Sequence, residues 1–331
     1  MKTKIKKIKV ACFDSIRVEN QWIGITVIPS LGGKISSIQN LKTGREWMWT
    51  SPYLNYKSPI YGKSYIQEYD TGGFDECFPT VDACFHPSHP WDGVYIPDHG
   101  EVFSQPWETE CCEINEKQEV LITLSVSGVR FPYKFKRSIV LYPNEKLLSL
   151  SYSIKNHCDF NLPFIWSSHP IMNIEPGMKI LFPTQTEAKI GFAVDDYPGR
   201  SGDSFVWPEF KNPGSPPVNL GLIPDPTSKN FKPLGVKIFT KNLREGWTKL
   251  ITKDGKEAFS FSFSLNEIRN VALWLNFKKW SGSCSPPYFN IAYEPTIGAC
   301  DALDIAVRYH HCAASIPARG EYKWSLGIGI H

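Results

Sequence analysis

Short runs in which apolar and polar residues alternate are the feature that most constrains the fold of this chain. The run 120–127 (VLITLSVS) places Val120, Ile122, Leu124 and Val126 on one face and mostly polar residues on the other, as a half-buried strand requires. Convincing helical periodicity is hard to find. The alternation recurs, with turn residues such as Tyr142-Pro143-Asn144-Glu145 between runs, at 133–141, 148–154, 259–265, 271–276 and 322–328.

Repeated short strands separated by turns predict an all-β sandwich or barrel rather than βα units. The 26 prolines and 24 glycines supply the turns, and a chain of 331 residues can form one large β architecture. The stretch between Asp195 and Pro233 is rich in Pro, Gly, Ser and Asp. Because strand patterning continues on both sides of it, we expect a surface excursion and a single domain over residues 1–331.

The charge balance excludes some classes of partner. A net charge of +3 from 36 basic and 33 acidic residues creates no strong field of one sign, so no nucleic-acid partner is expected. No segment approaches the ~20 apolar residues of a membrane helix, and the lysine-rich start is not followed by the apolar core of a signal peptide. We expect a cytoplasmic protein, with reduced and buried cysteines, that forms a monomer or homodimer.

Motifs for cofactor chemistry are absent. The sequence contains no G-x-G-x-x-G after a strand, no P-loop, no H-E-x-x-H and no G-x-S-x-G. A metal site is disfavoured because its candidate ligands include no Cys-x-x-Cys pair; these ligands are Cys77, Cys84, His86, His89 and His99. Chemistry by side chains alone, with no cofactor and no metal, is the prediction.

Two predicted strands carry residues suited to acid and base chemistry. In 162–170 (LPFIWSSHP), His169 shares a face with Ser167, and it is either an acid or a structural histidine. In 289–295 (FNIAYEP), Glu294 shares the face of Asn290 and Ala292. It is either a base or an edge charge that faces solvent.

A third segment, 69–107, mixes charged, histidine and aromatic residues in a region of loops. It contains GGFDECFPTV, with Asp75 and Glu76, and DHGEVFSQPW, with His99. Such loops often line sugar sites, where polar groups bind hydroxyls and aromatic faces bind the apolar side of the ring. A well-packed polar loop is the alternative.

Together the three segments resemble the aldose 1-epimerase (galactose mutarotase-like) family. LGGKISSIQN near the start and PARGEYKWSLGIGI near the end are also similar to that family, in the same order. The resemblance implies a large antiparallel supersandwich with few helices, His169 as acid and Glu294 as base. It implies substrate contacts that we assign to His99, Asp75, Glu76, Trp166 and Trp274.

The resemblance implies an isomerase that interconverts the α and β anomers of a free hexose or related aldose. The family's substrate-contacting arginine and sugar-binding aspartate have no clear counterparts, and the acidic Asp75 and Glu76 indicate a differently decorated sugar. Two alternatives stay open. One is a carbohydrate-binding protein without catalysis; the other is a glycosidase with Glu294 and Asp75 or Glu76 as its two carboxylates.

Overall fold

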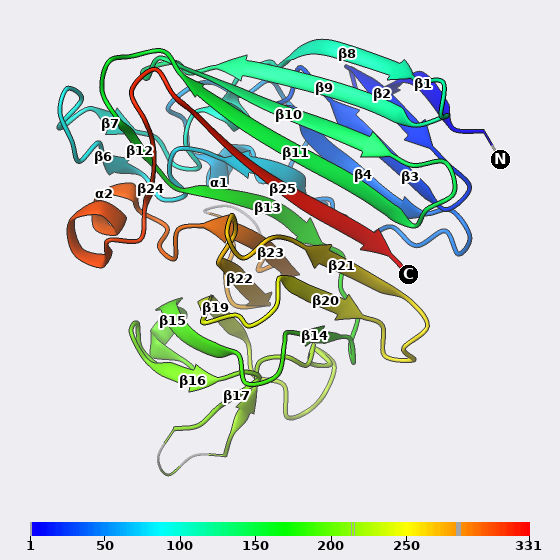
Figure 1. The fold of residues 1–331 in the computed structure, drawn as a ribbon. Coiled ribbons are helices and arrows are strands. Elements are labelled where there is room, and N and C mark those ends of the chain that lie inside the picture. Colours follow the sequence, from blue (N-terminus) through cyan, green and yellow to red (C-terminus); the bar gives the residue numbers. More distant parts are fainter. Residues whose placement is uncertain (1, 213, 215, 283–285) are drawn as a thin grey trace.

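The structure is a computed structural model that describes residues 2–212, 214, 216–282 and 286–331. Nearly all of its regular structure is β, in two large antiparallel sheets (Figure 1). The larger sheet has the strand order β1 (Lys4–Val10), β2 (Phe13–Glu19), β3 (Ile23–Ile28), β4 (Lys34–Asn40), β5 (Gly73–Cys77), β13 (Trp166–Met172), β23 (Phe289–Ile297), β22 (Asn270–Phe277), β19 (Leu234–Lys241), β15 (Glu187–Ala193), β16 (Ser204–Val206), β17 (Glu209–Phe210) and β18 (Val218–Asn219). The prediction of an all-β antiparallel fold is confirmed.

The second sheet has eight strands among the described residues. Their order is β14 (Lys179–Leu181), β20 (Trp247–Ile251), β21 (Ala258–Ser262), β25 (Glu321–Ile330), β11 (Leu147–Asn156), β10 (Tyr133–Leu141), β9 (Val120–Ser127) and β8 (Glu108–Ile114). Two small pairs are β12 (Leu162–Phe164) with β24 (Ala314–Ile316) and β6 (Cys84–Phe85) with β7 (Tyr95–Ile96). The helices are short: α1 (Tyr65–Glu68), η1 (Val102–Ser104), η2 (Val194–Asp196), α2 (Leu303–Ile305) and η3 (Ala306–His310).

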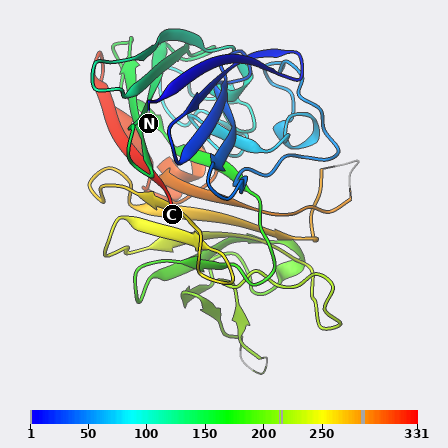
Figure 2. The same cartoon turned by 90° about the vertical axis from the view of Figure 1, so that its right-hand side faces the viewer.

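The core lies between the two large sheets. Trp166 of β13 packs against Tyr152 of β11 and Trp324 of β25, each with ring centroids 5.0 Å apart. All three side chains are buried in one hydrophobic cluster that spans both sheets. In Figure 2 the amino-terminal strands (blue) and the later strands (yellow and green) occupy opposite ends of the molecule. The apolar face of each alternating strand therefore points into the sandwich, as period-two patterning requires.

Most predicted strands match the observed ones, and two differ. The hairpin β10–β11 turns at the predicted Tyr142–Glu145 stretch, with Leu141 opposite Leu148. The alternating pattern over 259–265 is longer than the observed strand, because β21 ends at Ser262. The segment 162–170 is divided at Ile165, whose amide donates to the Pro79 carbonyl, so β12 pairs with β24 while β13 enters the larger sheet.

The stretch from Asp195 to Pro233 adds strands to one edge of the larger sheet. Strands β16, β17 and β18 follow β15 in order, each paired with its predecessor. Residues 213 and 215 lie outside the described part of the chain.

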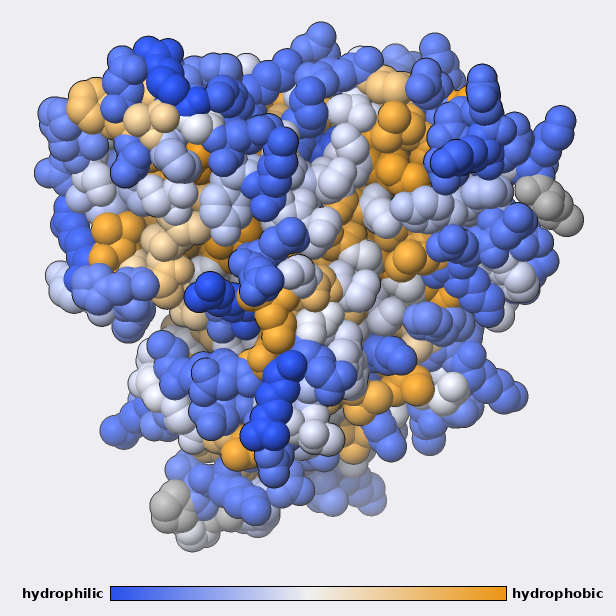
Figure 3. Space-filling model, viewed as in Figure 1, coloured by the Kyte–Doolittle hydropathy of each residue, from blue (hydrophilic) through white to orange (hydrophobic). Residues whose placement is uncertain are grey.

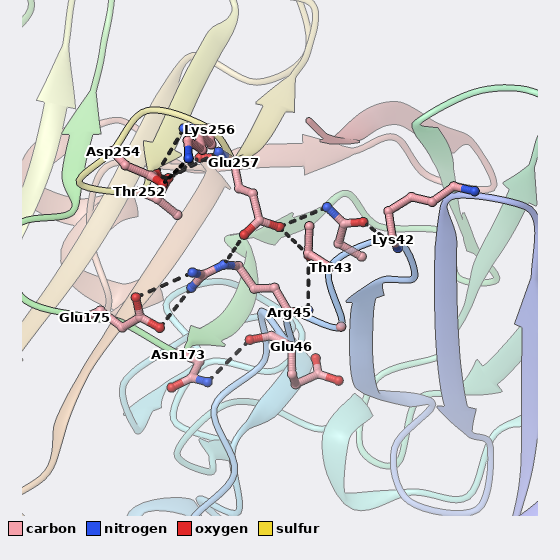
Figure 4. Close-up of polar contacts among 12 residues, drawn as sticks. Lys42, Thr43, Arg45, Glu46, Asn173, Glu175, Thr252, Asp254, Lys256 and Glu257 are labelled. Atoms are coloured by element: carbon pink, nitrogen blue, oxygen red, sulfur yellow. Dashed lines mark hydrogen bonds and ion pairs between the residues drawn. The ribbon is translucent and has the colours of Figure 1, made fainter.

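A polar cluster around Arg45 joins segments that are distant in sequence (Figure 4). Its guanidinium pairs with Glu257, between β20 and β21, at 2.8 Å and with Glu175, after β13, at 3.0 Å. Asn40 and Thr43 also donate hydrogen bonds to Glu257. Because Arg45 and Glu257 are largely shielded from solvent, this cluster ties the loop after β4 to the β20–β21 hairpin more firmly than an exposed pair would.

The surface face in Figure 3 is mostly hydrophilic, with apolar residues scattered over it. Among the described helices, none has the length and apolar character needed to cross a membrane. The described cysteines are free. Cys77 and Cys84 are buried as predicted, but Cys12 and Cys112 are exposed because they lie in a turn and on an edge strand, and Cys284 lies outside the described residues.

Candidate active site

A cavity of about 300 Å³ lies on the face of the larger sheet that points away from the smaller sheet. The pairing register places its side chains. Trp274 on β22 lies opposite both Ala292 on β23 and Lys237 on β19, and Ala292 lies opposite Ile171 on β13. Residues opposite one another share a face, and so do residues two apart on one strand. His169 and Glu294 therefore project into the same cavity as Lys237 and Trp274.

Glu294 is buried in the middle of the sheet, with 0% of its surface exposed. Oε2 accepts hydrogen bonds from Lys237 at 2.8 Å and from the Ser167 hydroxyl at 3.0 Å, while Oε1 accepts one from Lys237 at 2.9 Å. Each carboxylate oxygen offers about two lone-pair sites. Oε1 is thus the oxygen with capacity for a substrate hydroxyl, and the reading of Glu294 as a solvent-facing edge charge is wrong.

His169 lies inside β13, with Nε2 3.9 Å from Oε1 of Glu294. Burial lowers its pKa well below the ordinary value, and the positive charges of His99, Lys237 and Lys34 add to that effect. These surroundings therefore favour the neutral form of His169. Its Nδ1 is buried and has no hydrogen-bond partner among the described residues.

His99 lies in the loop between β7 and η1 and reaches the same cavity. Its Nδ1 is 2.7 Å from the Asp98 carboxylate, and its ring stacks on Tyr65 with centroids 3.8 Å apart. Burial opposes protonation, but the carboxylates of Asp98, Asp70 and Glu294 outweigh it and raise the pKa of His99. The His99 and His169 rings are perpendicular, with centroids 4.8 Å apart, so an imidazole of raised pKa adjoins one of lowered pKa.

Comparisons with known proteins bear on the fold. A galactose mutarotase related enzyme from Lactobacillus acidophilus matches with a TM-score of 0.64 and 17% identity, over 96% of this chain and 97% of that one. A galactose mutarotase-like protein from Clostridium acetobutylicum matches with a TM-score of 0.65 and 13% identity, over 100% and 99%. This chain has the galactose mutarotase-like fold. No protein-family model and no curated protein gives a significant match.

The site contains a residue that our sequence reasoning missed. Lys237 pairs with Glu294 and also with Asp301, at 3.3 Å. Burial alone would lower its pKa, but Asp301 and Glu294 raise it, so Lys237 is a cation and not a nucleophile. The available signal was a lysine between Val236 and Ile238 in an otherwise apolar strand, since a lysine in such a run needs a buried partner.

Three further carboxylates line the cavity: Asp70, Asp82 and Asp301. Burial raises the pKa of Asp70 to about 6, and its Oδ1 is buried with no hydrogen-bond partner among the described residues. Asp82 and Asp301 are adjacent, because the amides of Val81 and Asp82 donate to the Asp301 carbonyl. The cavity therefore holds more carboxylates than cations.

Asp75, Glu76 and Trp166, which were expected to contact substrate, do not line this cavity. Glu76 and Trp166 point into the sandwich, where Trp166 donates to Glu76 at 2.8 Å and Arg137 pairs with Glu76 at 2.9 Å. Asp75 is on the cavity face but is covered, because it pairs with Lys34 and accepts from the Tyr65 hydroxyl at 2.8 Å. The structure thus assigns these three residues to packing, as a correction to our prediction. His99 and Trp274 do line the cavity.

The candidate metal ligands named from the sequence are dispersed. Across the described residues, no group of three or more His, Cys, Asp or Glu side chains has the geometry to hold a metal ion. His86, for example, is buried beside Trp91 and Phe131, while His89 packs on Phe160.

Proposed function

We propose that this protein is an aldose 1-epimerase that interconverts the α and β anomers of a free aldose. The observation that carries the proposal is the approach of His169 Nε2 to within 3.9 Å of Glu294 Oε1 in a cavity that His99 also lines. The anomeric hydroxyl and the ring oxygen of an aldose are bonded to the same carbon. An acid and a base that serve both must therefore lie close together, as these two side chains do.

In the proposed reaction, Oε1 of Glu294 takes the proton of the anomeric hydroxyl while the C1–O5 bond breaks. The ring oxygen takes a proton from the imidazolium form of His169, whose Nε2 lies 3.9 Å from Glu294 Oε1, and His169 is left neutral. Because burial lowers the pKa of His169, its imidazolium form gives up this proton readily. The open-chain aldehyde then rotates about C1–C2 and recloses on its other face, which returns both protons.

The environment of Glu294 suits the role of base. Lys237 and Ser167 occupy Oε2 and hold the carboxylate in one orientation, so that Oε1 faces His169. A positioned acid or base contributes typically 10²–10⁴-fold to a rate. The glycosidase alternative loses both of the second carboxylates that the sequence suggested for it, because Glu76 points into the core and Asp75 is covered by Tyr65.

Proton NMR magnetisation transfer between the anomers of a panel of free aldoses tests the proposal. The wild-type protein should accelerate exchange for at least one sugar. Glu294→Gln should lower kcat by about 10²–10⁴-fold while sugar binding, followed by tryptophan fluorescence, persists. His169→Ala should also lose most of the exchange. Binding without acceleration of any sugar would overturn the proposal in favour of a carbohydrate-binding protein.

A further inference from the structure

We propose that Phe192, Trp274 and Trp280 form a second sugar subsite at the mouth of the cavity, so that the preferred substrate is the reducing end of a disaccharide or longer oligosaccharide. This inference rests on the proposed epimerase activity and deepens it. We call these three residues the aromatic subsite. All three line the cavity that holds His169 and Glu294.

A β-bulge brings Phe192 to the cavity. Ile190 pairs with Ile238, but the register then shifts, and Phe192 pairs with Lys237. Without the shift, Gly191 would lie opposite Lys237, and Phe192 would share the face of the buried Ile190, pointing into the core. Bulges commonly re-aim a side chain next to an active site. Here the bulge places a phenylalanine with 53% of its surface exposed on the face of Lys237 and Trp274.

The three rings form a corner with two faces. Phe192 and Trp274 are nearly parallel, with an angle of 26° between their planes and centroids 6.3 Å apart. Trp280 stands at 90° to Trp274, with centroids 5.8 Å apart. Both tryptophans are only partly buried. Such a corner suits the apolar face of a pyranose, because a sugar ring is flat on one side and polar around its edge.

Phe192, at the outer end of the aromatic subsite, lies on a strand further from that of Glu294 than the width of one sugar ring. His169, Glu294, Trp274, Lys237 and Phe192 lie on five successive strands, β13, β23, β22, β19 and β15. Neighbouring strands are about 4.8 Å apart, so Glu294 and Phe192 are on strands separated by roughly 14 Å. A pyranose whose anomeric carbon touches Glu294 does not extend that far, whereas a second linked ring does.

The charged residues around the aromatic subsite favour a neutral glycosyl unit as its ligand. Lys237, which lies opposite both Phe192 and Trp274, is already paired with Glu294 and Asp301. At the outer edge, Lys279, which is next to Trp280 in sequence, pairs with Asp195 at 2.7 Å. The subsite therefore offers apolar faces and neutralised polar groups to its ligand.

Matched pairs of monosaccharide and disaccharide test the inference by anomer exchange: glucose against maltose and cellobiose, xylose against xylobiose, and galactose against β-1,4-galactobiose. At least one disaccharide should have a kcat/KM about tenfold above its monosaccharide, and Phe192→Ala should lower that ratio about tenfold. The control is Phe85→Ala, which removes an equally exposed phenylalanine (58%) outside the cavity and should leave the ratio unchanged. Equal kcat/KM values within every pair, or an equal loss for both sugars in Phe192→Ala, would overturn the inference.

The two proposals fail in distinguishable ways. If the protein exchanges the anomers of monosaccharides and shows no preference for disaccharides, the proposed subsite is refuted and the proposed epimerase activity stands. The opposite outcome is that the protein accelerates anomer exchange for no sugar, but binds maltose or cellobiose, and Phe192→Ala weakens that binding about tenfold. The proposed epimerase activity is then refuted and the proposed subsite stands.

Discussion

The ammonium group of Lys237 lies 2.8 Å from Oε2 and 2.9 Å from Oε1 of Glu294, so the proposed base is neutralised by a buried lysine. Both side chains come from the interior strands of one sheet, and almost no solvent reaches either. Ion pairs in such surroundings are costly to break, because the remaining charge is left without a partner. Lys237 thus acts on Glu294 as a positioning residue.

Replacing Lys237 should lower both the rate of the reaction and the stability of the protein. In Lys237→Met, the Glu294 carboxylate loses the cation that holds it in place, so kcat should fall on the order of 10²-fold. The free energy of unfolding should fall by about 3–5 kcal/mol. Polarimetric assays of anomer exchange measure kcat for the folded variant. Lys279→Met, at the more exposed pair with Asp195, is the control, and an unchanged kcat in Lys237→Met would refute the role of Lys237.

Hexose 6-phosphates should be poor substrates. Asp70, Asp82, Glu294 and Asp301 line the cavity, so a dianionic group meets repulsion. Lys237 is the one lysine or arginine among the described lining residues, and it is already paired. We expect kcat/KM for a hexose 6-phosphate to be at least about tenfold below that of the free hexose. The difference should narrow as salt rises from about 0.01 to 0.15 M, because salt screens the repulsion. A phosphate that is turned over as well as the free sugar would contradict this charge argument.

Asp70 should reduce stability at neutral pH. Its pKa is about 6 in the folded protein against an ordinary 3.8, so between these values the folded protein keeps a proton that the unfolded chain has lost. Stability therefore falls as the pH rises through this interval, and the full penalty applies above pH 6. Asp70→Asn should raise the free energy of unfolding at pH 7 by an amount on the order of 3 kcal/mol, and much less at pH 4.

Urea unfolding at the two pH values measures the effect of Asp70→Asn. Asp14→Asn, at an exposed strand residue, is the matched control and should change little. A gain of the same size at pH 4 and pH 7 would show that the carboxylate charge is not its cause.

Glu76 should matter for stability and not for the chemistry. Its carboxylate is fully buried between Arg137, Tyr152 and Trp166, so Glu76→Gln leaves the Arg137 charge without its counter-ion. The free energy of unfolding should fall by about 3–5 kcal/mol, while kcat and KM of the folded variant stay close to wild type. Asp159→Asn, in the exposed pair with Arg319, should leave the unfolding midpoint unchanged. A specific loss of kcat in Glu76→Gln would return Glu76 to the active site.

The sequence by itself determined the all-β class and the positions of most strands. It also placed His169 and Glu294 on strands. These follow from the period of two, which is a local property of the chain. The same period could have excluded Trp166, because it lies three residues from His169 and so points to the opposite face. Asp75 and Glu76 are adjacent, so one of them had to face the core.

Only the tertiary structure decided which residues meet across strands. The side chains of the pairs His169–Glu294 and Lys237–Glu294 come from residues more than fifty positions apart in the chain. Both pairs depend on the order and register of β13, β23, β22 and β19. The position of Phe192 depends on one bulge, and a shift of one residue moves a side chain to the other face. Register depends on contacts across the whole sheet, so the composition of a single strand does not specify it.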